Sequence, residues 1–126
     1  MPGEKFEQGL RVRREVLGAE YVERAIAGAD AFNRDFQEMV TETAWATWAR
    51  DGLARKQRSL IVLGMLAALN RPQEFELHFR GALRNGCTLD ELRETLLQIA
   101  AYCGIPAGVE AFRIARRVLD EAGIKP

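Results

Sequence analysis

Residues 58–112 read RSLIVLGMLAALNRPQEFELHFRGALRNGCTLDELRETLLQIAAYCGIPAGVEAF, and this stretch decides the fold class. Its apolar residues recur every three or four positions, which is the spacing of one face of an α-helix. Pro72 suits the first turn of a helix, and Thr88-Leu-Asp-Glu91 is a capping-box sequence. No part of the chain alternates apolar and polar residues for long, as a half-buried strand would. The stretch therefore predicts an all-α protein.

Helical spacing continues outward from this stretch to both ends of the chain. Turn residues such as Gly18, Arg50-Asp51-Gly52 and Asn85-Gly86 separate the periodic segments. The chain of 126 residues has the usual length of one domain and contains no repeat, low-complexity tract or linker. We therefore predict a single helical domain over residues 1–126 with about six to seven helices. These are expected at about residues 6–17, 21–27, 30–48, 53–69, 72–84, 88–103 and 106–122.

The run LIVLGMLAAL at residues 60–69 is apolar on every side of its helix. Such a helix must be covered all round, and a chain this short offers few other helices to cover it. We therefore expect contacts between subunits to cover part of it, which predicts a homo-oligomer. The run is about half of the ~20 residues that a membrane span needs, so we interpret it as a core helix.

Composition and charge exclude several function classes. Lys and Arg balance Asp and Glu at 18 each, so no global field favours nucleic acid or an anionic membrane. The first residues, MPGEK, carry no apolar signal-peptide core, and we expect a cytoplasmic protein. Cys87 and Cys103 are predicted to be free thiols, although a disulfide between them stays open. One histidine and two scattered cysteines do not form a transition-metal site, and no aspartate cluster suggests magnesium.

His78, the one histidine, shares a helical face with Phe75, Phe79 and Ala82. Glu74 lies four residues earlier, within reach of the imidazole ring. A carboxylate there would fix the tautomer of the ring and favour its charged form. The pattern indicates a titratable group in an apolar wall, which is either catalytic or a structural histidine without chemistry.

Arg58 lies one turn into the helix expected at residues 53–69, just before the apolar run. A guanidinium near a helix N-terminus favours an anion through its N–H donors and through the helix dipole. The alternative is a solvated charge, which is the preferred interpretation for Arg55 and Lys56.

Glu38 and Glu42 lie one turn apart, upstream of Trp45 and Trp48. If either carboxyl group faces inward beside an indole ring, desolvation raises its pKa and makes it a candidate proton donor. The alternative is that both glutamates face water.

The stretch 58–112 resembles the core of the carboxymuconolactone decarboxylase family. The segments VRREVLGAEYV (residues 12–22) and FNRDFQEMVTETAWATWARDGLARKQRSL (residues 32–60) resemble its N-terminal half. The resemblance implies an alkylhydroperoxidase-D-like all-α fold, assembled as a homo-trimer or homo-hexamer. Where some members read Pro-Ala-Ala-Asn-His, this chain has Pro-Ala-Gly-Val-Glu at residues 106–110, which leaves the exact substrate open.

Two chemistries occur in this family, and the sequence discriminates between them. Redox members carry Cys-x-x-Cys-x-x-x-His where this chain has Arg71-x-x-Glu74-x-x-x-His78, and their relay glutamate lies where it has Arg58-Ser59. A peroxidase needs a reactive thiolate and a resolving thiol, so the decarboxylase branch is favoured. A thiol-dependent redox protein and a non-catalytic helical oligomer are the alternatives. Cys103 at the end of a helix is interpreted as inert, although a reactive thiol there stays open.

The resemblance implies cofactor-free decarboxylation of 4-carboxymuconolactone, or of a close lactone acid, to 3-oxoadipate enol-lactone in aromatic-acid catabolism. The implied partners are the carboxylated lactone and further copies of the chain, with neither nucleic acid nor membrane. We assign catalytic roles to His78, Glu74 and Glu38, no residue to a metal, and substrate binding to Arg58, Trp45 and Tyr102.

Overall fold

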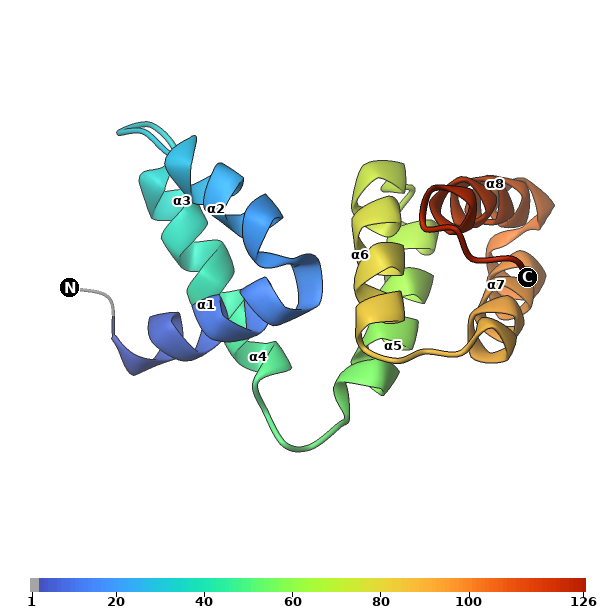
Figure 1. The fold of residues 1–126 in the computed structure, drawn as a ribbon, viewed down its shortest axis with the longest axis horizontal. Coiled ribbons are helices and arrows are strands. Elements are labelled where there is room, and N and C mark those ends of the chain that lie inside the picture. Colours follow the sequence, from blue (N-terminus) through green and yellow to red (C-terminus); the bar gives the residue numbers. More distant parts are fainter. Residues whose placement is uncertain (1–2) are drawn as a thin grey trace. The chain divides into compact units, whose positions relative to one another are not determined.

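The computed structural model of the chain describes residues 3–126, and every regular element in that range is helical (Figure 1). Counting α3, η1 and α4 as one interrupted helix, these residues form seven helices, so the predicted all-α class is confirmed. The elements are α1 (Glu4–Leu17), α2 (Ala19–Ala27), α3 (Arg34–Val40), the π-helical turn η1 (Thr41–Trp45), α4 (Ala46–Trp48), α5 (Arg55–Ala68), α6 (Pro72–Arg84), α7 (Leu89–Cys103) and α8 (Ile105–Glu121).

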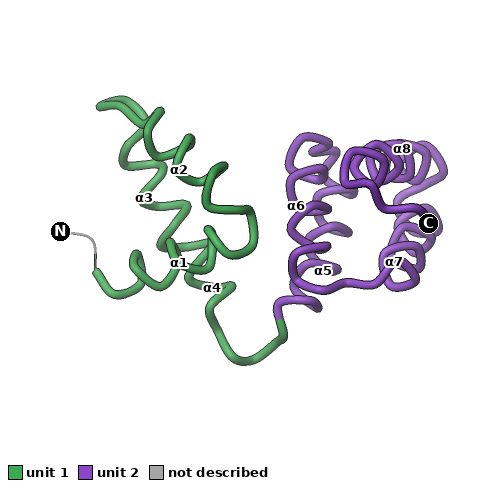
Figure 2. Tube along the Cα trace, viewed as in Figure 1, with its two compact units in different colours: residues 1–54 green, residues 55–126 purple. Residues whose placement is uncertain are grey.

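The helices group into two compact units, residues 1–54 and residues 55–126 (Figure 2). Unit 1 contains α1 to α4, and unit 2 contains α5 to α8. The assignment of residues 1–126 to one domain stays a prediction.

In unit 1, α1 packs its buried face against the π-helical turn η1. Gly9 lies at the closest point, because a Cβ atom there would overlap the carbonyl oxygen of Thr41. Gly18, with φ at 92°, ends α1 and separates it from α2. The buried residues of α1 are Gly9, Val12, Arg13, Val16 and Leu17.

The helix expected from residue 30 begins at Arg34, four residues later. The Asp30 carboxylate accepts the backbone N–H of Phe32 at 2.9 Å and that of Asn33 at 3.2 Å. The Asn33 side chain accepts the N–H of Asp30 at 2.8 Å in return. These local bonds satisfy the backbone in a turn before the helix starts, so Asp30 does not act as the simple helix start that the sequence suggested.

In unit 2, α5 and α6 form a hairpin that packs against α7 and α8. The predicted capping box is confirmed: Thr88 Oγ1 accepts the Glu91 N–H at 3.1 Å, and Glu91 accepts the Thr88 N–H at 2.8 Å. Glu91 also forms an ion pair with Lys56 at 2.9 Å, which joins the first turns of α5 and α7. The core contains the fully buried Leu63 together with residues from α6, α7 and α8.

Within unit 2, the apolar helix α5 is only partly covered. Ser59 and Leu63 are its buried residues, whereas Ile61, Met65 and the following Leu69 are exposed. These three side chains are four residues apart and therefore form one stripe along the helix. None of the helices in residues 3–126 is both long and apolar enough to span a membrane.

Replacing Gly9 by Ala is expected to destabilise the protein, because the new methyl group overlaps the Thr41 carbonyl oxygen. The free energy of unfolding should fall by about 1–3 kcal/mol in urea denaturation. Gly64→Ala is the matched control, since no neighbour lies within 4 Å of a Cβ at that helical position. It should leave stability unchanged or raise it by up to ~1 kcal/mol. Equal effects of the two substitutions would contradict this packing.

Candidate active site

His78 lies in the middle of α6 at the edge of the hydrophobic core. The neighbouring Phe75 and Phe79 are buried, and their rings stack with centroids 6.3 Å apart. His78 itself is half-buried, and its Nδ1 atom is shielded from solvent. Burial disfavours the charged ring and lowers the pKa of His78 from 6.5 to about 4. At neutral pH the side chain is therefore a neutral imidazole, with one N–H donor and one acceptor nitrogen.

The sequence analysis expected Glu74 to favour the charged form of His78, but the pKa of the ring is lowered rather than raised. Glu74 is exposed at the start of α6, and the effect that sets the pKa of His78 is loss of water around the ring. Sequence spacing showed that the two side chains share a side of the helix, but it could not show how much solvent the ring loses. The catalytic roles of both residues remain predictions.

The beginning of α5 and the end of α6 are joined by a polar contact that the sequence analysis missed. Asn85 Nδ2 donates a hydrogen bond to Ser59 Oγ at 2.9 Å, and Ser59 is fully buried. The period of 3.6 residues places Asn85 on the same side of α6 as His78, two turns away. The bond therefore fixes the register of the hairpin that carries both His78 and Arg58. The signal for this contact in the sequence was Ser59, which directly precedes the apolar run at residues 60–69.

Arg58 is half-buried in the first turn of α5, and its Nε atom is shielded from solvent. The neighbouring Lys56 is held by Glu91, as described above. The structure thus places Arg58 beside the buried Ser59, rather than on a fully solvated surface. This position is compatible with the predicted role in anion binding, which stays a prediction.

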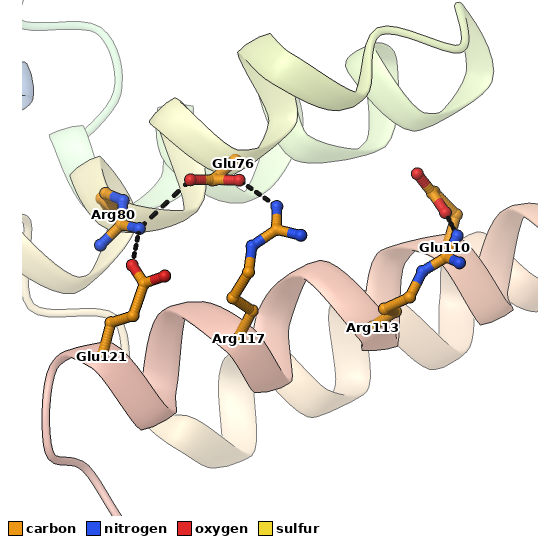
Figure 3. A network of polar contacts seen from close by, with 6 residues as sticks. All are labelled: Glu76, Arg80, Glu110, Arg113, Arg117 and Glu121. Atoms are coloured by element: carbon orange, nitrogen blue, oxygen red, sulfur yellow. Dashed lines mark hydrogen bonds and ion pairs between the residues drawn. The ribbon is translucent and has the colours of Figure 1, made fainter.

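A network of ion pairs joins α6 to α8 (Figure 3). Glu76 accepts a hydrogen bond from Arg117 of α8. It accepts a second one, 3.2 Å long, from Arg80, which lies one turn later on α6. Arg80 also pairs with Glu121. The bond from Arg117 is the main reason why the pKa of Glu76 lies below its usual value. Helical periodicity places Glu76 and Arg80 on the side of α6 opposite His78, so the network fixes α6 without using the histidine side.

Glu38 and Trp45 belong to unit 1. Trp45 is buried and stacks on Trp48 with ring centroids 5.4 Å apart. Glu38 and Glu42 are exposed on the same interrupted helix. The structure therefore supports a buried indole but does not place either carboxyl group in an apolar environment within this unit. The assignments of Glu38 and Trp45 stay predictions.

Tyr102, the remaining predicted residue, is 84% exposed near the end of α7. The next residue, Cys103, is also exposed and lines a pocket of about 410 Å³. The wall of this pocket includes Arg71 and Glu110, but neither Tyr102 nor His78. The structure thus does not bring Tyr102 into a cavity with His78.

The two cysteines are free thiols, as predicted. Cys87 is buried and its Sγ donates to the Lys56 carbonyl oxygen at 3.5 Å. Burial raises the pKa of the Cys87 thiol, which opposes formation of a thiolate. Within residues 3–126, no group of three or more His, Cys, Asp or Glu side chains is arranged to hold a metal ion.

Comparison with known proteins identifies the class to which this chain belongs. A model described as "Carboxymuconolactone decarboxylase family" matches residues 34–117. A nitrosuccinic acid decarboxylase, npaB, of Metarhizium robertsii is 46% identical over 117 residues, 92% of this chain and 82% of that protein. A 4-carboxymuconolactone decarboxylase of Acinetobacter baylyi is 41% identical over 124 residues, 98% of this chain and 92% of that protein.

The fold and these similarities define an all-α carboxy-lyase that acts on a small-molecule carboxylic acid. The chain belongs to the carboxymuconolactone decarboxylase family, which has the alkylhydroperoxidase-D-like fold.

The low pKa of His78 predicts acid sensitivity. The folded protein holds fewer protons than the unfolded chain between pH 6.5 and about 4, so stability falls as the pH drops through this window. The loss should approach about 3 kcal/mol. Urea denaturation at pH 7 and pH 4.5 measures it, with His78→Gln as the comparison. The variant should lose less stability on acidification, because the carboxylates titrate alike in both proteins and only wild type has the ring. An identical loss in both proteins would contradict the burial of a neutral ring.

Proposed function

We propose that this decarboxylase acts without a cofactor on 4-carboxymuconolactone or a close lactone acid, releasing CO₂ and 3-oxoadipate enol-lactone. The observation that carries the proposal is a neutral, half-buried His78 against an apolar wall. Such a group donates a hydrogen bond to an oxygen that becomes negative during reaction. The similarity to a 4-carboxymuconolactone decarboxylase along 98% of the chain supports it. The proposal places the protein in the cytoplasm, in aromatic-acid catabolism.

The chemistry needs no external electron acceptor. The departing carboxylate lies on the saturated ring carbon next to the ring double bond, and this double bond is conjugated with the lactone carbonyl. When the C–C bond to CO₂ breaks, its electron pair moves through the double bond onto the carbonyl oxygen of the lactone. The product of this step is a dienolate. A proton then returns to a ring carbon. The protein has to bind the remaining carboxylate, stabilise the dienolate oxygen and supply the proton.

In unit 2, we assign the remaining carboxylate to Arg58, whose planar guanidinium binds carboxylates through two parallel hydrogen bonds. His78 donates its N–H to the dienolate oxygen. Glu74, at the exposed start of the same helix, is kept as a supporting residue for the ring.

In unit 1, we assign the return of the proton to Glu38, with Trp45 as a flat apolar contact for the substrate. Tyr102, near the end of α7 in unit 2, is assigned to substrate binding. For Glu38 and Tyr102 this role requires a less solvated state than the one in the structure, where both are exposed.

Nitrosuccinic acid is the second candidate substrate, because the relative of that name is 46% identical to this chain. It also has two carboxylates, and one of them lies on the carbon that bears the nitro group. Loss of CO₂ places the electron pair on the nitro oxygens, so the same hydrogen-bond donor would stabilise the product anion.

The test is release of CO₂ from purified protein in chelator-treated buffer, with each of the two acids offered separately. We expect release from 4-carboxymuconolactone that is proportional to enzyme concentration and unaffected by the chelator. Release only from nitrosuccinate would assign the protein to the second substrate. Release from neither, together with peroxide reduction through Cys87 or Cys103, would overturn the proposal.

Two substitutions should affect the kinetics differently. His78→Ala removes a hydrogen bond made mainly in the transition state, so kcat should fall ~10²–10³-fold with little change in KM. Arg58→Ala removes a contact present in substrate and transition state, so KM should rise roughly 10–100-fold, with partial rescue by guanidinium. Circular dichroism verifies that both variants fold. Full turnover by a folded His78→Ala protein would show that the histidine is structural.

We further propose that the protein works as a homo-oligomer, with a trimer or hexamer expected. The support is the exposed stripe of Ile61, Met65 and Leu69 on a helix that the rest of unit 2 leaves partly uncovered. Contiguous apolar surface of this kind is typical of contact sites between subunits.

Sedimentation at micromolar concentration should give an assembly of three or six chains. Met65→Glu inserts a charge into the stripe and should shift the population towards monomers. Ala122→Glu, in the exposed segment after α8, adds the same charge elsewhere and should leave the assembly intact. A monomeric wild-type protein would contradict the proposal.

A further inference from the structure

A second pocket, of about 350 Å³, lies within unit 2, and we call it the α7–α8 pocket. Most of its wall comes from α7 and α8, and one residue of α6 contributes to it. Pockets that bind small molecules have volumes of about 300–1,000 Å³ and are mostly apolar, with a few polar groups. The α7–α8 pocket has this composition, because its apolar wall includes Phe79, Leu92, Leu96, Phe112, Ala115 and Leu119.

Three charged side chains also line the α7–α8 pocket, namely Asp90, Arg93 and Arg116. Two of them neutralise each other, because Arg93 Nη1 lies 3.1 Å from Asp90 Oδ1. The side chain of Arg116 has no hydrogen bond or ion pair to any group within residues 3–126. Arg116 is also exposed, so its guanidinium lies at the rim of the pocket rather than in the core. The pocket therefore has one positive charge that its own wall does not balance.

The two other arginines in this part of α8 have carboxylate partners. Arg113 forms an ion pair with Glu110, and Arg117 forms one with Glu76 (Figure 3). Of the three, the arginine without a partner is the one that lines an apolar pocket. A planar guanidinium offers paired N–H donors that match the two oxygens of a carboxylate. This combination fits an anion with an apolar body and one carboxylate.

Two phenyl rings line the pocket from different helices. Phe79 of α6 is buried, whereas Phe112 of α8 is 41% exposed. Aromatic rings pack favourably on one another beyond the area that they bury. A rigid ring also loses less conformational freedom on binding than a flexible chain of similar size. The apolar body that this wall favours is therefore aromatic.

We propose that the α7–α8 pocket binds an aromatic monocarboxylic acid, whose ring contacts Phe79 and Phe112 while its carboxylate pairs with Arg116. The residues of unit 2 that the proposed reaction uses do not line this pocket. The acid is therefore bound as a ligand and is not converted. Because it binds the folded state, it stabilises unit 2 in proportion to its occupancy.

The probe is 2-naphthoate, an aromatic monocarboxylate. Two matched ligands separate its features: 2-naphthylmethanol has the same ring without the charge, and octanoate has the carboxylate on a flexible chain. Isothermal titration calorimetry gives the dissociation constant of each ligand for wild type, Arg116→Met, Phe112→Leu, Arg113→Met and Arg58→Ala. Arg113→Met is the control for charge, since it removes an equal charge from α8 outside the pocket. Arg58→Ala tests whether the probe binds at the site of the proposed reaction.

2-Naphthoate should bind wild type with a dissociation constant of about 0.1–1 mM. Arg116→Met should weaken the binding of both carboxylates roughly 3–10-fold and leave 2-naphthylmethanol unaffected. Phe112→Leu should weaken both naphthyl ligands roughly 2–10-fold and leave octanoate nearly unaffected. Octanoate should bind wild type more weakly than 2-naphthoate does. Arg113→Met and Arg58→Ala should bind 2-naphthoate as wild type does.

Absence of 2-naphthoate binding, or equal affinities of wild type and Arg116→Met, would overturn the proposal. An equal loss in Arg113→Met would reduce the effect to net charge, and octanoate binding as tight as that of 2-naphthoate would exclude the aromatic class. Loss of binding in Arg58→Ala would place the probe elsewhere. Smaller assemblies of Phe112→Leu in sedimentation would assign the pocket to a contact between subunits.

The release of CO₂ is measured on the same proteins. Arg116→Met should retain the wild-type rate, because the pocket is separate from the residues of the proposed reaction. A protein that binds 2-naphthoate through Arg116 but releases no CO₂ disproves the proposed function alone. One that releases CO₂ but does not bind 2-naphthoate disproves this inference alone.

Discussion

Burial of one side of α6 is the constraint on which the rest of unit 2 depends. Phe75, Phe79 and Ala82 must leave water for the four-helix core to form, and His78 lies at the edge of the same surface. The ring is therefore partly desolvated because the helix is folded, and desolvation keeps it neutral. The opposite side of α6 is fixed by Glu76 through its bonds to α8. The core and the ion pairs together hold the histidine in one environment.

A neutral imidazole suits the proposed chemistry. Decarboxylation of an acid that carries its own electron acceptor requires a hydrogen bond to the acceptor oxygen, and a neutral ring supplies one without bringing a proton that would titrate near neutral pH. The negative charges of the substrate need cations instead. Arg58, which is half-buried with its Nε atom shielded from solvent, is the cation that the proposed function assigns to this role. Binding charge and stabilising the transition state are thus assigned to different side chains.

Periodicity predicted the helices because each needs one apolar face, and the capping box at Thr88 was predicted because its bonds are local. The late start of α3 was not predicted, since competing bonds of Asp30 favour a turn. The family and the positions of His78 and Arg58 also followed from the sequence. The neutral state of His78 did not, because desolvation depends on tertiary packing. The α7–α8 pocket beside Arg116 was not predicted either, because it exists only where residues of three helices pack together.

The charge state of the one histidine tests the central claim most directly. With imidazole nitrogen-15 labelling, the spectrum of wild-type protein contains a single histidine ring, that of His78. The account predicts a neutral ring at pH 7 that protonates only near pH 4, with ring signals that shift when a dicarboxylic substrate analogue binds. A ring that titrates at pH 6.5 or above, and whose signals do not change with the analogue, would contradict the account.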